Sequence, residues 1–231
     1  MRYAHVMLAV IVCSLSVGCQ QIEQVLNPMP TTEGSRVSDK LRSIPRPDPA
    51  NVKTVTVYRF TNKTGFPHGL AISNGMTEQL ITALVKTGHF KVVERAELGD
   101  VGMEKQLQAS GQASGDAGTT QMMGAELIFA GAVTELDETG GGGLSVAHGN
   151  MGVGLQTVSA QVGLDMRVID VGTSQILDSI DVRRRVRRSG MTAAHTWGVS
   201  AGVEISNALD LAIRETVEEA VYQLVTRYGA L

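Results

Sequence analysis

The sequence QTVSAQVGLDMRV, residues 156–168, alternates between two kinds of residue. Apolar residues fill the even positions from Val158 to Val168, whereas the odd positions from Thr157 to Arg167 are polar or glycine. Because successive side chains of a β-strand point to opposite faces, this two-residue period predicts a strand with one buried face. The same alternation is the weak signature of a strand that crosses a membrane as part of a barrel.

Further strands are predicted on both sides of this stretch. Residues 162–171 and 174–182 form a predicted hairpin across Gly172-Thr173. Upstream, residues 126–133 (ELIFAGAV) are apolar on both faces, which predicts a central strand of a sheet. Two segments rich in β-branched and aromatic residues are predicted as additional strands: residues 53–61 and 90–94.

Helical periodicity appears between the predicted strands. Residues 70–87 carry an apolar face, and Gly88 is suited to end the helix. Residues 204–228 give the clearest helical stripe, ended by Gly229. Two weaker helices are predicted: residues 96–109 and 119–124. Alternating strands and helices predict an α/β (α+β) domain with a mixed sheet.

The N-terminus has the pattern of an export signal. Arg2 is followed by twelve uncharged residues, 6–17, and then by Cys19. Residues 15–19 resemble a bacterial lipobox, which implies that residues 1–18 are removed and that Cys19 carries lipid. An ordinary signal peptide with an incidental cysteine is the alternative. Glutamines at 20 and 21 favour, by resemblance to sorted lipoproteins, the outer membrane.

The segment from residue 19 to residue 51 is predicted to be a tether. It contains five of the six prolines of the chain, and the remaining residues are mostly polar. Such a composition buries little apolar surface and extends readily. We therefore expect this segment to set the distance between the lipid anchor and the folded domain.

Two inserts do not fit a compact domain, which leaves residues 52–134, 162–182 and 204–231 for that domain. If these inserts cross a membrane, as the family resemblance described below implies, residues 135–161 fit a first membrane hairpin with a turn near Gly149-Asn150, and residues 183–203 fit a second, less well, with a turn at Ala194-His195. The second insert opens with five arginines: Arg183, Arg184, Arg185, Arg187 and Arg188.

These arginines limit where the second insert can lie. An arginine on the lipid face at mid-membrane costs ~2–4 kcal/mol. The five are therefore expected on the periplasmic sheet, at the lipid headgroups, or as a basic rim of a lumen. A solvated basic strand outside any membrane is the alternative.

Several classes of chemistry lack support in the sequence. The formal net charge is −3, which argues against nucleic acid as a partner. The five histidines show no pair at metal-ligand spacing, and no phosphate-binding loop or nucleophile elbow is present. We expect no metal, no cofactor and no enzymatic activity.

Five segments in order resemble the CsgG family, the curli production assembly/transport component and its holdfast-anchoring relatives. They are the lipobox at Cys19, VTVYRFTNKTG at 55–65, LITALVKTGHFKVVER at 80–95, ELIFAGAVTEL at 126–136 and MRVIDVGTSQILDS at 166–179. The resemblance implies an outer-membrane lipoprotein with a periplasmic α/β domain and two β-hairpins per subunit. It further implies a homo-oligomeric ring of about nine subunits whose hairpins complete one transmembrane barrel.

The resemblance also implies a function. Such a pore exports unfolded amyloid-like or adhesin subunits by diffusion and without catalysis. Accessory assembly proteins are its implied partners. Curli members carry a long constriction loop after the first strand, but here only residues 66–74 fill that place; Phe66 and His68 are the candidates for a residual aperture. The alternative is a lipid-tethered periplasmic scaffold that docks on a cell-envelope enzyme or assembly without forming a pore.

Overall fold

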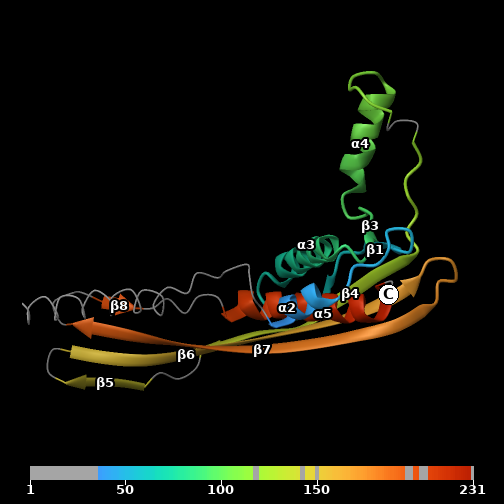
Figure 1. The fold of residues 1–231 in the computed structure, drawn as a ribbon. Helices are drawn as coiled ribbons and strands as arrows, with labels where there is room; N and C mark the ends of the chain where they lie inside the picture. Colours follow the sequence, from blue (N-terminus) through green and yellow to red (C-terminus); the bar gives the residue numbers. More distant parts are fainter. Residues whose placement is uncertain are drawn as a thin grey trace, which may run out of the picture.

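The structure is a computed structural model that describes residues 36–116, 120–140, 144–148, 151–195, 200–202 and 208–229 (Figure 1). In this part of the chain, one eight-stranded mixed sheet follows the order β3-β1-β4-β6-β7-β8, with β2 beside β4 and β5 beside β6. The strands are β1 Thr54–Val57, β2 Thr61–Asn62, β3 Lys91–Val92, β4 Leu127–Gly140, β5 Leu144–His148, β6 Met151–Asp170, β7 Ile176–His195 and β8 Ser200–Gly202. The predicted mixed α+β fold is confirmed.

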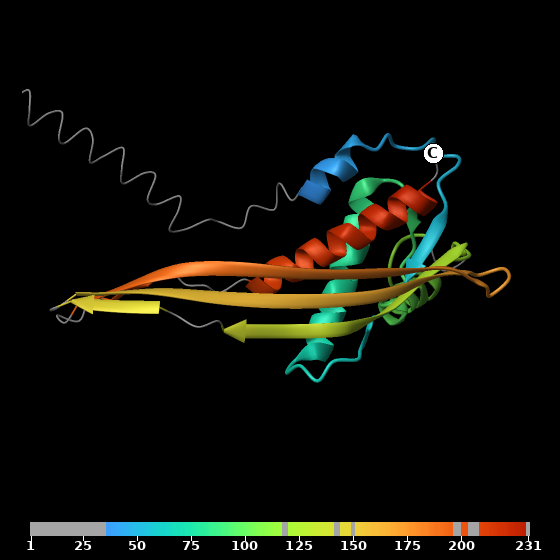
Figure 2. The ribbon, with the colours of Figure 1, turned by 90° about the horizontal axis from the view of Figure 1, so that it is seen from below.

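Three long strands dominate the molecule. β4 lies between parallel β1 and antiparallel β6, so the predicted central strand is confirmed. β6 and β7 form the predicted hairpin, but they pair without interruption from Met151↔His195 inward to Val168↔Asp178. These strands run far past the helices in both views (Figures 1 and 2). Residues 135–140 of β4, 151–161 of β6 and 183–195 of β7, assigned to inserts from the sequence, therefore continue core strands, whereas β5 and β8 are separate short strands.

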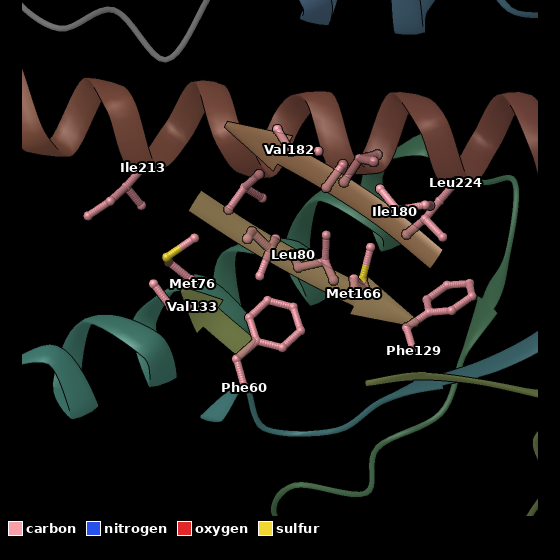
Figure 3. Packing of buried hydrophobic residues seen from close by; sticks show 14 of the residues in the cluster. Phe60, Met76, Leu80, Phe129, Val133, Met166, Ile180, Val182, Ile213 and Leu224 are labelled. Atoms are coloured by element: carbon pink, nitrogen blue, oxygen red, sulfur yellow. The ribbon is translucent and has the colours of Figure 1, made fainter. Parts of the chain in front are cut away.

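Helices cover one face of the sheet. α2 (Arg36–Ser43), α3 (Gly69–Thr87) and α5 (Ala208–Tyr228) lie on the same side in Figure 1. The even positions of β6 from Ala160 to Val168 are buried beneath them, together with apolar residues of α3 and α5 (Figure 3). The alternation in the sequence therefore predicts the core face of β6 correctly. The apolar side chains lie on the face covered by the helices because their burial removes apolar area from water.

The helix ends follow the sequence signals in part. Gly88 ends α3 with φ 69°, a left-handed conformation that glycine adopts without strain. α3 begins at Gly69, which confirms the helix predicted over residues 70–87 and shortens the connection that the comparison with curli members left at residues 66–74. α4 (Leu98–Ala109) has no buried residue and projects away from the sheet (Figure 1). Residues 120–124, predicted as part of a short helix, are not helical.

The predicted tether is not extended throughout. Residues 36–43 form α2, and Leu41 and Ile44 pack against the core. Lys40 lies over the ring of Tyr222 on α5, 5.7 Å from its centre, and the imidazole Nε2 of His89 lies 3.1 Å from the carbonyl oxygen of Pro45. A helix of 8 residues is marginal alone, so docking on α5 is what stabilises it.

A β-bulge in β4 decides which face Glu135 occupies. Val133 pairs with Leu164 and Leu136 pairs with Val162, so both lie on the core face, while the register shifts between Val133 and Glu135. If Thr134 were paired with Gly163 instead of being skipped, Glu135 would take the core position and Leu136 the opposite face. The bulge therefore keeps the apolar pattern of β4 in register with β6.

Candidate functional site

The candidate site is the part of the sheet that extends beyond the core. We call it the ribbon: β5, β8, residues 134–140 of β4, 151–163 of β6 and 183–195 of β7. Its helix face is the one that carries buried Val162, on the side of α5; its open face is the other. On β6 and β7, even-numbered residues belong to the helix face and odd-numbered residues to the open face, because paired residues share a face.

The register separates the five arginines into two groups. Arg184 and Arg188, which pair with Val162 and Val158, lie on the helix face. The other three lie on the open face opposite Gly163, Gln161 and Ser159: Arg183, Arg185 and Arg187. The sequence predicted one basic cluster. The two-residue period of a strand divides it between the two faces, and the pairing adds which residue lies opposite each arginine.

The two innermost arginines are neutralised by acids. Arg183 donates to Glu135 at 2.8 Å and to both carboxylate oxygens of Asp181 at 2.6 and 2.5 Å. On the other face, Arg184 donates to Glu219 of α5 at 2.6 Å. A Cβ on Gly163 would lie 2.9 Å from the Cβ of Glu135, so glycine is needed for this close approach.

None of the three outer arginines forms an ion pair within the described residues. Arg185 donates to the amide oxygen of Gln161 at 2.9 and 2.6 Å, and the amide nitrogen of Gln161 donates to Glu135 at 2.6 Å, so the charge of Arg185 acts on Glu135 only from behind Gln161. No hydrogen bond or ion pair within the described residues engages Arg187 or Arg188. Positive charge therefore accumulates along β7 toward the tip of the ribbon.

A pair of carboxylates lies inward of Arg183. Asp165 and Asp181 are cross-strand neighbours on the open face. Burial raises the pKa of Asp165, and the negative charge of Asp181 raises it further. One oxygen of Asp165 and the hydroxyl of Thr134 are buried and form no hydrogen bond of normal geometry with any described residue. Sequence reasoning missed this pair because no pattern links the two residues, which are sixteen positions apart in the chain.

The apolar positions change face within the ribbon. On the core part of β6 they are the even positions, whereas in the outer ribbon the odd positions 151, 153 and 155 are Met, Val and Leu. The paired positions 144 and 146 of β5 and 191 of β7 are also apolar. The helix-face positions there hold Gly152, Gly154, Gln156, Gly190 and Thr192. No bulge separates the two regions of β6 and β7, so the change lies in the sequence alone.

The ribbon has two open edges. β7 pairs with β6 along its whole length, but on its other side β8 pairs only with Thr192–Ala194. Beyond Val133, β4 has β6 on one side and no described strand on the other. Both edges therefore present unpaired backbone N–H and C=O groups within the described residues.

The remaining predicted positions fall in different places. Phe66 is half-buried and packs against the core, while exposed His68 precedes α3 with a φ of 59°. Cys19 and the turn at residues 149–150 lie outside the described residues, although His148 does pair with Met151. The predicted second turn at Ala194-His195 is wrong, because Ala194 is a strand residue paired with Ser200.

Metal ligands and membrane-spanning helices are both absent from the described residues. These residues contain no group of three or more histidine, cysteine or acidic side chains arranged to hold a metal ion. In the same ranges, every helix is too short or too polar to cross a bilayer.

A sequence profile of the family described as "Curli production assembly/transport component CsgG" matches residues 36–229. No curated protein gives a significant match. Among solved structures, the PelC dodecamer from Paraburkholderia phytofirmans is 13% identical with a TM-score of 0.37, covering 81% of this chain and 96% of that chain. Lipoprotein GNA1162 from Neisseria meningitidis is 13% identical with a TM-score of 0.33, covering 73% and 97%. At TM-scores this low, neither supports a conclusion.

Proposed function

Because the chain belongs to the CsgG family, we propose that it is an outer-membrane lipoprotein whose ribbon joins ribbons of other copies in a membrane-spanning barrel. The barrel serves as a non-catalytic pore or anchor for exported, curli-like or holdfast fibre subunits. The α/β domain lies in the periplasm, and Cys19 carries the lipid that holds the domain at the membrane.

The observation that carries this proposal is the change of apolar face along β6. In the core, apolar residues belong on the side of the helices. Beyond the helices, a water-exposed ribbon has no need of an apolar face, yet one appears on the opposite side at positions 151, 153 and 155. A barrel strand alternates between lipid-facing apolar and lumen-facing polar or small residues. The outer open face then contacts lipid, and the glycine-rich helix face lines the lumen.

The open edges make oligomerisation a requirement of insertion. An unpaired backbone group in hydrocarbon costs several kcal/mol, so an isolated ribbon cannot span a bilayer. In one copy, β5, β6, β7 and β8 are neighbours and successive strands are antiparallel. The β8 edge of one copy beside the β4–β5 edge of the next continues that alternation. Repetition of this head-to-tail contact closes a ring.

The aperture residues predicted from the sequence remain proposals within this picture. Phe66 and His68 precede α3 on the short connection from β2, where they could narrow the entrance of a pore. The packing of Phe66 against the core favours His68 as the more accessible of the two.

Neighbouring positions of β6 provide a matched test. Val153→Arg places a charge on the face assigned to lipid, while Gly154→Ser adds a small polar group on the face assigned to the lumen. We expect Val153→Arg to abolish conductance in planar bilayers and to reduce recovery of a large detergent-extracted ring, since an arginine at mid-membrane costs ~2–4 kcal/mol per copy. Gly154→Ser should retain both. Equal behaviour of the two variants, or a monomer in every mild detergent, would contradict the proposal.

A tethered scaffold without a pore is the second candidate. It is favoured by α4, which buries none of its residues in this chain and exposes Met103 at 65%. Such a helix is suited to contact another protein. Deleting residues 144–157 distinguishes the two functions: a scaffold should keep its fold and its partner, whereas a pore should lose conductance.

A further inference from the structure

The open face of the ribbon changes character stepwise along the pair β6–β7. At the tip, Met151 pairs with His148 of β5 and His195 of β7, and the next two open-face pairs of β6 and β7 are apolar: Val153↔Ala193 and Leu155↔Met191. The next pair is Thr157↔Ser189, whose hydroxyl oxygens lie 3.4 Å apart. Arginines follow at the next two pairs, Ser159↔Arg187 and Gln161↔Arg185. Apolar, hydroxyl and cationic residues thus succeed one another on a single face.

This order matches the layers of a membrane surface. Moving from hydrocarbon toward water, a protein surface meets acyl chains, then glycerol and ester groups, then phosphates. Strand residues rise about 3.3 Å each, so position 159 lies roughly 13 Å inward of position 155. Arginine is suited to phosphate because its planar guanidinium donates two parallel hydrogen bonds.

The charges of Arg185 and Arg187 remain available for such a contact. Arg183 on the same face is already bound to Glu135 and Asp181. Arg185 donates to Gln161, which separates it from Glu135, so Arg185 forms no direct ion pair; Arg187 has no partner in the described residues. The acid nearest in register is Asp137, which pairs with Gln161 and forms no ion pair within the described residues. Both arginines are exposed.

We propose that Arg185 and Arg187 bind the phosphate groups of anionic phospholipids at the membrane surface nearest the helix layer. This proposal rests on the proposed function, since it requires the outer ribbon to lie in the bilayer. It adds a preference for anionic lipids and a depth of insertion of the ribbon. The boundary of the membrane lies between the Thr157↔Ser189 pair and the two arginines. In a ring, the arginines of successive copies form a cationic belt around the barrel.

Arg187 and Arg188 are adjacent in the sequence but lie on opposite faces, so their variants compare lipid binding by the two faces directly. Full-length protein in detergent is mixed with vesicles of phosphatidylcholine alone or with phosphatidylglycerol added, and bound protein is measured by flotation. Each arginine near an anionic surface strengthens binding by about fivefold. We expect Arg187→Gln to lower the gain from phosphatidylglycerol by about fivefold and the double variant R185Q/R187Q by about thirtyfold. Arg188→Gln, the matched control on the helix face, should leave the gain within about twofold of wild type.

The outcomes separate this proposal from the pore itself. Wild-type protein that fails to insert into either vesicle contradicts the proposed function, whereas normal insertion of R185Q/R187Q with an unchanged lipid preference overturns only the belt. An equal loss in Arg188→Gln would also overturn it, because net charge rather than face would then govern binding. Inorganic phosphate should weaken the preference no more than chloride at equal ionic strength. Selective competition by phosphate would point to a site for the free anion and overturn the lipid assignment.

Discussion

The core and the ribbon share the strands β6 and β7, yet they place their apolar residues on opposite faces. In the core, Leu164 and Met166 face the helices and are fully buried. In the ribbon, the apolar positions 151, 153 and 155 belong to the open face. Since the pairing is continuous, the backbone does not distinguish the two regions. One hairpin can therefore be compatible with both water and lipid when its apolar residues shift from even to odd positions along the strand.

Reversing the faces that the bulge assigns should damage the core more severely than any other change. The exchange E135L/L136E would place a carboxylate on the core face and a leucine on the open face, which combines a buried charge with a lost apolar contact. We expect a loss of more than about 3 kcal/mol in the free energy of unfolding, measured by urea denaturation followed by circular dichroism. Thr134→Ala, which keeps the bulge and removes an unsatisfied buried hydroxyl, should stay within about 1 kcal/mol of wild type. Similar losses in both variants would contradict the role of the bulge.

A matched pair of leucines on β6 contrasts the two regions directly. Leu164 is fully buried against the helices, so Leu164→Ala should lower the free energy of unfolding in detergent by about 2–5 kcal/mol. Leu155 lies on the open face of the ribbon, and Leu155→Ala should cost less than about 1 kcal/mol because detergent or lipid replaces the lost contact. A larger effect at 155 than at 164 would show that protein, rather than lipid, covers the outer open face.

The ion pair between β7 and α5 offers a smaller effect. Arg184 binds Glu219 at 2.6 Å, and their side chains are 36% and 21% exposed. Solvent screening limits such a pair, so we expect Arg184→Gln to lower the free energy of unfolding by about 1 kcal/mol or less. Arg188→Gln on the same face, without an acidic partner in the described residues, should have no measurable effect. The salt dependence of the difference between the variants would confirm its electrostatic origin.

The smallest predicted effect concerns the pH dependence of the carboxylate pair. Burial and the charge of Asp181 raise the pKa of Asp165, so the folded state binds a proton more tightly there than the unfolded state does. Stability should therefore fall as the pH rises from the ordinary aspartate pKa through the raised one. At neutral pH, Asp165→Asn should stabilise the protein by about 1 kcal/mol or less, because like charges on opposed strands repel by roughly that amount. Thermal unfolding from acidic to neutral pH measures this; a destabilised variant at neutral pH would contradict it.

Much of the fold could be predicted from periodicity, whereas the bulge in β4 and the docking of α2 could not. The alternation at 156–168 located the core face of β6, and the doubly apolar run at 126–133 located the central strand. The bulge could not be predicted, because nothing in the sequence VTEL, residues 133–136, indicates that the pairing with β6 skips one of these residues. α2 was missed because a short helix depends on tertiary docking rather than on its own propensity.

The arginine cluster shows a different limit. Five arginines in six positions of the sequence give no information on which partner strand lies opposite each one, and the partner decides whether a charge is neutralised. The change of apolar face, in contrast, was available to sequence reasoning. If the comparison of even and odd positions is extended from residue 156 back to residue 151, the sequence shows that the apolar residues move to the odd positions.

The tight turn that joins β6 to β7 lies at the end of the hairpin farthest from the ribbon tip. Asp170 accepts hydrogen bonds from the backbone and hydroxyl of Thr173 at 2.7 Å, which closes a short loop at little entropic cost. We expect pairing to nucleate at this turn and to extend outward, so that the half of the hairpin beneath the helices forms before the segment assigned to lipid. The open edges of the ribbon would then remain unformed until the chain reaches a bilayer. Pulse-labelling of amides during refolding, with residues 164–182 protected before residues 151–157, is the measurement that bears on this order of events.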